Sequence, residues 1–320
     1  MLFARLVAAA LLASPLGGIA QDYPAKPVRI VVPYAAGGGV DTVARGLAQD
    51  LGDALRQSVI VDNRPGANSV IGTEHVARAA ADGYTLLATV GSHYAMPFLA
   101  GNVSYDPVRD FTPVSILGKA PQSLLVHSSV PAKTVAELID YVKRNPGRVS
   151  FATSGAGTSQ HLGGALLNMM AGLDMVHVPY KGGGPAMNDL LGGQVPVALL
   201  LMSNALPHAR AGKIRILAVI ESSRARAAPD VPTVAEAGVP GFAVPDTWIG
   251  ILGPARLAAP VVSRLNTELA RVVELPAARA RLEAAGFEVG LVQAADFARA
   301  AVPTTDAYRR ITADAKIKPE

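Results

Sequence analysis

Two glycine-rich turns contain the residues of this sequence that are best suited to bind a ligand. One is the run AAGGG at residues 35–39, and the other is GAG at residues 155–157. Each turn follows an apolar, strand-like run and precedes an amphipathic, helix-like run. The first turn of a helix exposes unpaired N–H groups at the positive end of the helix dipole, and glycine lets a ligand approach the backbone closely. The two turns therefore predict anion-binding sites built largely from main-chain atoms.

Other kinds of chemistry lack the residues that they require. The chain contains no cysteine, which excludes thiol nucleophiles, disulfides and cysteine-ligated metals. Its six histidines are scattered without metal-ligand spacing, so we predict neither a metal site nor a cofactor. Neither turn has the P-loop pattern, and Gln160 stands where a dinucleotide-binding turn needs its third glycine. An exported enzyme acting on a carboxylate stays an alternative, with Ser154 and His161 as its only local candidates.

The composition and the N-terminus indicate an exported protein. Half of the 320 residues are hydrophobic and 17% are charged, which allows a sizeable core. The formal net charge is +4, without a basic patch interleaved with aromatic residues, so we expect no nucleic-acid partner. Residues 1–20 combine Arg5, an apolar run and small residues before Gln21, which is the pattern of a signal peptide. We therefore predict secretion into the periplasm, with a membrane anchor as the alternative.

Strand-like and helix-like runs alternate along the chain and predict an α/β fold. Residues 28–93 have the order β-α-β-α-β, and residues 123–220 alternate in the same way. Helical patterns dominate from residue 261 to the C-terminus. Within the second block, Thr134 and Glu137 have the spacing of a capping box at the start of a helix.

Two proline-rich stretches, around residues 105–121 and 222–246, bracket the second block. They predict a discontinuous first lobe, residues 21–121 plus 222–320, and an inserted second lobe, residues 122–221. Each lobe is expected to be a mostly parallel sheet flanked by helices. Because ligands bind at the carboxyl ends of strands in such sheets, both glycine turns would grip a ligand between the lobes.

Three stretches together resemble the Bug (TctC-like) family, the periplasmic solute receptors of tripartite tricarboxylate transporters. They are VRIVVPYAAGGGVDTVAR, FATSGAGTSQHL and VPYKGGGPAMNDLLGGQV, and the resemblance extends over about residues 22–315. It implies a two-lobed periplasmic-binding-protein fold that closes on a small organic acid, without catalysis. It also implies separate membrane transporter subunits as partners, and we expect a monomer. A receptor that feeds a signalling system would have the same fold, and the sequence does not distinguish the two.

The resemblance also implies a set of ligand-binding residues. They lie in the first loop, after the third strand, in the second loop, and at later strand ends: Tyr34, Ala35, Gly37, Gly38 and Asp41; Ser92 and His93; Ser154, Gly157, Thr158 and Ser159; Tyr180, Asn204, Thr247 and Trp248. Because a carboxylate would repel an acidic ligand, Asp41 is interpreted as interacting with the N-terminus of its own helix. His161 is expected to brace the second loop.

The sequence departs from the family pattern at PVALLLMSNALP, residues 196–207, where the family has an acidic residue and a polar strand end. An apolar wall near Leu200 and Met202 would suit a ligand with an apolar body. The alternative is that these leucines are buried strand residues. Ser203 and Asn204 are the polar groups beside them.

Overall fold

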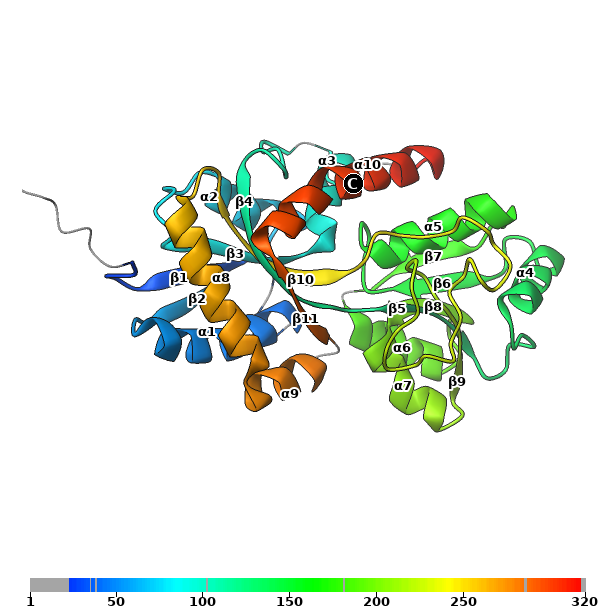
Figure 1. Cartoon of the computed structure of the whole chain (residues 1–320). Helices are drawn as coiled ribbons and strands as arrows, with labels where there is room; N and C mark the ends of the chain where they lie inside the picture. Colours follow the sequence, from blue (N-terminus) through cyan, green and yellow to red (C-terminus); the bar gives the residue numbers. More distant parts are fainter. Residues whose placement is uncertain are drawn as a thin grey trace, which may run out of the picture.

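The computed structural model describes residues 23–317, apart from residues 35, 38, 102, 181 and 285–286. The predicted signal peptide lies outside the described residues, and so do Ala35 and Gly38. The described chain forms two β-sheets with helices on both faces of each, arranged as two lobes (Figure 1). The two-lobed α/β fold predicted from the sequence is confirmed. In the described part of the chain, no helix is long and apolar enough to cross a membrane.

The first lobe contains a six-stranded sheet in the order β11-β4-β10-β3-β1-β2. Its strands are β1 (Val28–Val32), β2 (Val59–Asn63), β3 (Thr85–Val90), β4 (Phe111–Lys119), β10 (Trp248–Pro254) and β11 (Glu288–Gln293). The helices α1 (Gly39–Leu55), α8 (Ala259–Glu274) and α9 (Pro276–Ala284) share one hydrophobic core with it. On the other face lie α2 (Val70–Ala77), a 3₁₀ helix η1 (Gly91–Ala95), α3 (Met96–Leu99) and α10 (Ala294–Asp314).

The second lobe contains a five-stranded sheet in the order β7-β6-β8-β5-β9. Its strands are β5 (Gln122–His127), β6 (Ser150–Thr153), β7 (Val176–Pro179), β8 (Val197–Leu201) and β9 (Ile214–Val219). The helices α4 (Val135–Arg144) and α5 (Ser159–Ala171) cover one face, and α6 (Gly183–Leu191) and α7 (Met202–Arg210) cover the other. The predicted cap of α4 is present, since Thr134 Oγ1 accepts a hydrogen bond from Glu137 N at 3.1 Å.

Both sheets are mixed, which differs from the expected mostly parallel arrangement. The pairs β1–β2, β1–β3, β6–β7 and β6–β8 are parallel, whereas β10 and β5 pair antiparallel with both of their neighbours. β5 and β10 are the strands that begin directly after the two segments in which the polypeptide crosses from one lobe to the other. Periodicity along a strand reports its burial and says nothing about the direction of its neighbour, so this feature was not readable from sequence.

The segment after β9 packs against the second lobe before the chain returns to the first (Figure 1). Val234 N donates to Val219 O at 2.9 Å, and Val244 N donates to Ile220 O at 3.1 Å. We propose that the return passage lies at residues 245–247, so that residues 222–244 belong to the second lobe. The two passages are joined where Ala120 N donates to Thr247 O at 2.7 Å.

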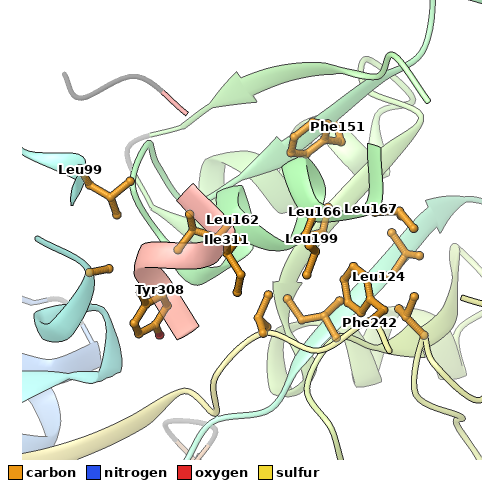
Figure 2. Close-up of a cluster of buried hydrophobic side chains, with 14 of the residues drawn as sticks. Leu99, Leu124, Phe151, Leu162, Leu166, Leu167, Leu199, Phe242, Tyr308 and Ile311 are labelled. Atoms are coloured by element: carbon orange, nitrogen blue, oxygen red, sulfur yellow. The ribbon is translucent and has the colours of Figure 1, made fainter. Parts of the chain in front are cut away.

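The C-terminal helix α10 links the lobes a third time. It begins beside the first sheet and packs against α5 of the second lobe. Figure 2 shows Tyr308 and Ile311 of α10 in one buried cluster with Leu162 of α5. Because this apolar cluster is continuous across the gap between the sheets, the two lobes share part of their core.

Candidate functional site

The first glycine loop connects β1 to α1 and is held by the side chain of Asp41. Asp41 is 2% exposed. Its Oδ2 accepts from Gly37 N at 2.8 Å and from Arg45 Nε at 3.0 Å, and its Oδ1 accepts from Asn63 Nδ2 at 2.9 Å. Burial alone would raise the pKa of Asp41, but these hydrogen bonds hold it below its ordinary value. Asp41 therefore faces into its own loop, and Gly37 N–H is not available to a ligand.

Removing the Asp41 carboxylate should loosen this loop. In Asp41→Ala, Gly37 N and Asn63 Nδ2 lose their acceptor, so we expect a loss of about 1–3 kcal/mol in the free energy of unfolding. Ligand affinity should fall with it, because the start of α1 is no longer pre-organised. Urea unfolding and calorimetric titration measure the two effects. Asp53→Ala, at an exposed position of the same helix, is the control and should change neither. Equal behaviour of the two variants would contradict the role given to Asp41.

The residues after β3 point into the first lobe. Tyr34 of the neighbouring loop places its hydroxyl 3.2 Å from Thr89 Oγ1 of β3. His93 is 1% exposed, its Nε2 lies 3.0 Å from Pro107 O, and its ring packs against Tyr105 and Phe111. Burial lowers the pKa of His93 to about 4, so the imidazole is neutral at pH 7. His93 was predicted to bind the ligand, but Tyr105, from the loop before β4, and Phe111, the first residue of β4, enclose its ring. Ser92, beside it, is only partly buried.

The second glycine loop connects β6 to α5 and is braced by its own side chains. Thr158 is the N-cap of α5: its Oγ1 accepts from His161 N at 3.3 Å and donates to Gly155 O at 2.8 Å. Gly157, at φ +72°, donates its N–H to His161 Nδ1 at 3.2 Å. The imidazole of His161 stacks on His177 with ring centres 3.9 Å apart. His161 thus braces the loop.

The second loop also lies against the first lobe. Ser159 Oγ is 3.0 Å from Thr247 Oγ1 in the return passage. A Cβ at Gly157 would lie 3.6 Å from Leu99 Cδ1. The N–H groups of Ser159 and Gln160 stand in the first turn of α5, where the helix supplies no acceptor. This helix start is therefore placed where the two lobes meet, as an anion site between lobes requires.

The remaining predicted residues have different surroundings. Tyr180 donates its hydroxyl to Asp189 Oδ2 at 2.6 Å, and burial, together with Asp189, raises the pKa of Tyr180 to about 12. Asn204 is exposed at the start of α7, beside the β7–α6 turn at Gly183. Trp248 is 5% exposed and packs between Tyr94 and Phe297 on the α10 side. Of these three, only Asn204 presents a free polar group.

The segment that departs from the family pattern divides between core and groove. Leu200 is fully buried in the core beneath α6 and α7, which supports the interpretation as a buried strand residue. Met202 and Ser203 line a groove of about 580 Å³ between α7 and the opposite lobe, where Phe287 and Val289 form the facing wall. Charged side chains stand beside these apolar ones on both walls: Arg210 on the side of α7, and Arg279 and Glu283 on the side of α9.

Sequence reasoning missed the polar side chains behind the second loop. Gln160 is 5% exposed, Gln122 is 2% exposed and Glu221 is 4% exposed, and they form a connected group that reaches from Ser154 to the passages between the lobes. No local pattern marks them, because their partners lie 38 and 99 residues apart in the chain. The only available signal was that three strongly polar residues stand at the edges of strongly apolar runs.

A two-lobed α/β fold with helix N-termini at the junction of the lobes defines the class of periplasmic solute-binding proteins. The family described as "Tripartite tricarboxylate transporter family receptor" matches residues 43–316, and the chain belongs to this family. BugT of Bordetella pertussis is 38% identical over 268 residues, which cover 82% of this chain and 80% of BugT.

Solved structures support the same assignment. Rpa4515 of R. palustris, solved with adipate, has a TM-score of 0.81 and 33% identity over 93% of this chain and 100% of its own. The periplasmic binding protein BugD has a TM-score of 0.79 and 34% identity over 93% and 100%. MatC of Rhodopseudomonas palustris, solved with bound malate, has a TM-score of 0.77 and 32% identity over 90% and 99%.

Proposed function

We propose that this chain is an extracytoplasmic receptor that captures a small organic carboxylate between its lobes and delivers it to a tripartite tricarboxylate-type transporter. The observation that carries the proposal is the position of the α5 N-terminus, which lies 3.0 Å from Thr247, next to β10, through Ser159 and beside Leu99 of the first lobe through Gly157. A carboxylate bound there would contact both lobes and so favour the closed state. The similarity to proteins solved with adipate and malate supports a carboxylate as the ligand.

The contacts on the second-lobe side would come from the start of α5, the hydroxyls of Ser154 and Ser159, and the amide of Asn204. The hydroxyl of Thr247 would contact the ligand from the segment between the lobes. On the first-lobe side they would come from the loop that Asp41 holds. For Ala35 and Gly38, the proposal rests on the family resemblance alone. The separate membrane subunits, the monomeric state, and export by a signal peptide at residues 1–20 belong to the same proposal.

The enzyme alternative receives no support from the two side chains that suggested it. Ser154 donates its hydroxyl to Gln160 Oε1 at 2.6 Å, and His161 Nδ1 accepts from Gly157 N at 3.2 Å. The Ser154 hydroxyl is thus engaged with an amide oxygen, which cannot act as a general base. The family of this chain consists of receptors.

Thermal unfolding of the chain from residue 21 onward, against a panel of small acids, tests the proposal. The panel holds citrate, C4 to C6 dicarboxylates, acidic amino acids and benzoate-type acids. A ligand at 100 times its dissociation constant should add about 2.7 kcal/mol to the free energy of unfolding. For a chain of this size, the midpoint should rise by about 5 °C. Protein first unfolded, dialysed and refolded, to remove co-purified ligand, is used throughout. No shift with any acid would overturn the proposal.

A further inference from the structure

Ser154, in the second loop, is held by a chain of buried amides. Its N–H donates to Gln160 Oε1 at 2.7 Å, and its hydroxyl donates to the same oxygen at 2.6 Å. Gln160 Nε2 donates to Gln122 Oε1 at 2.7 Å, and Gln122 Nε2 donates to Ala120 O at 3.1 Å. This series of hydrogen bonds runs from the second glycine loop to Ala120, between β4 and β5, where the polypeptide first crosses between the lobes. Gln160 and Gln122 are 5% and 2% exposed, so water does not compete for these bonds.

The direction of every hydrogen bond in this series of amides is determined by the backbone groups at its two ends. The carbonyl of Ala120 can only accept, so the amide group of Gln122 must turn its NH₂ toward it. The oxygen of Gln122 then faces the NH₂ of Gln160, which turns the oxygen of Gln160 toward Ser154. At the other end, the backbone N–H of Ser154 can only donate, and it requires the same orientation. Flipping either amide would break bonds at both of its ends.

It follows that the hydrogen of the Ser154 hydroxyl is already used in a hydrogen bond and is not available to a ligand. An amide oxygen accepts only, so the Ser154 hydrogen points at Gln160, and the lone pairs of Ser154 Oγ are what the hydroxyl can offer to a ligand. Two neighbouring donors are also engaged: Thr158 Oγ1 donates to Gly155 O at 2.8 Å, and Gly155 N donates to Thr153 Oγ1 at 3.2 Å. A ligand carboxylate oxygen placed against Ser154 Oγ would set acceptor against acceptor.

We propose that Ser154, oriented by Gln160, makes this receptor selective for carboxylates that carry a hydroxyl group, which donates its hydrogen to Ser154 Oγ. The inference rests on the proposed function, and it names the ligand class within it. An ammonium group could also donate to Ser154. The hydroxyl is favoured because the loop lies at the positive end of the α5 dipole, which disfavours a cation. The side chain of Gln160 acts as a positioning group, since it orients the hydroxyl without contacting the ligand.

Calorimetric titration with matched acids tests the proposal on the chain from residue 21 onward. The pairs are succinate and malate, glutarate and 2-hydroxyglutarate, and adipate and 2-hydroxyadipate. For the chain length that binds best, the hydroxy acid should bind at least about tenfold more tightly, the size of one hydrogen bond gained against one acceptor left unpaired. Ser154→Ala should bring the ratio close to one. Ser150→Ala, at the opposite end of β6, is the control and should keep the ratio.

A second variant separates the orientation of Ser154 from its presence. Gln160→Met removes the acceptor and frees the Ser154 hydrogen, so the unsubstituted diacid should gain relative to the hydroxy acid. A merely structural role for Gln160 would weaken both ligands equally and leave the ratio unchanged, which would overturn the proposal. Equal or tighter binding of the unsubstituted acid by the unaltered chain would also overturn it, while leaving the proposed function standing. Binding of none of the six acids would overturn this proposal, whereas the proposed function falls only if the whole thermal panel also gives no shift.

Discussion

Gly72→Ala should unfold at markedly lower urea concentration than the unaltered chain. Gly72 lies in α2, where a Cβ would stand 2.6 Å from Arg64 O and 2.9 Å from Pro33 Cα. Both are backbone atoms and cannot rotate away, so α2 would have to move off the ends of β1 and β2. Overpacking of this kind costs about 3 kcal/mol in the free energy of unfolding.

The same substitution should weaken ligand binding, because of where the clash falls. Pro33 leads directly into the first glycine loop, and Arg64 N donates to Val32 O at 2.8 Å, at the end of the same strand. Moving either segment displaces Tyr34 and the start of α1. We expect the affinity for the best acid of the thermal panel to fall by about tenfold or more, since small misplacements of a pre-organised site are costly.

The matched control for Gly72 is Gly184→Ala in α6. A Cβ at Gly184 has no heavy atom within 4 Å apart from its chain neighbours, and the helix propensity of alanine offsets the restriction that Pro185 places on the residue before it. This variant should therefore be close in stability to the unaltered chain. If Gly72→Ala and Gly184→Ala unfold at the same urea concentration, the close packing of α2 on Pro33 is refuted.

Glu221→Gln should remove a large pH dependence from the stability of the protein. Glu221 follows β9 and is 4% exposed, and both of its carboxyl oxygens accept from Gln122 N, at 3.0 and 3.1 Å. Burial is the main reason why the pKa of Glu221 rises from its ordinary value of 4.5 to about 8. The nearby charge of Asp246 adds to the rise, and the backbone hydrogen bonds oppose it. Asp246 is itself paired with Lys119.

The sign of the effect follows from the raised pKa. Well below pH 4.5 the carboxyl is protonated in both the folded and the unfolded chain, so it does not lower the free energy of unfolding. As the pH rises from there to about 8, the unfolded chain releases the proton while the folded chain retains it, so the free energy of unfolding falls. Above about pH 8 the loss is complete. Between pH 5 and 8 the contribution of this one group is of the order of 4 kcal/mol.

Urea unfolding of both chains at several values between pH 5 and 8 measures this contribution. The advantage of Glu221→Gln over the unaltered chain should grow steadily with pH across this range. Glu283→Gln, at an exposed position of α9, is the control and should follow the unaltered chain. Parallel curves for the unaltered chain and Glu221→Gln would show that the buried carboxyl does not retain its proton.

Much of the fold could be predicted from the sequence, because its signals are local. The alternation of apolar strands with amphipathic helices specified two α/β lobes, and glycine at the ends of β1 and β6 marked the loops that precede α1 and α5. The cap at Thr134 was readable for the same reason: both members of its hydrogen bond lie within one helical turn. Asp41 was placed correctly against its own helix by a charge argument alone.

The tertiary structure decided which polar groups face a ligand. His93 follows a strand end, as binding residues do, yet Tyr105 and Phe111 fold over it and remove it from the cleft. The hydroxyl of Ser154 could donate or accept, yet it donates to Gln160 Oε1 and so offers a ligand only its acceptor lone pairs. The direction of the central strands and the bridge made by α10 were likewise decided by the tertiary structure. These features depend on contacts made only in the folded protein, such as the contact by which Gln122, 38 residues away, orients Gln160. Periodicity and turn chemistry report only on neighbours in sequence.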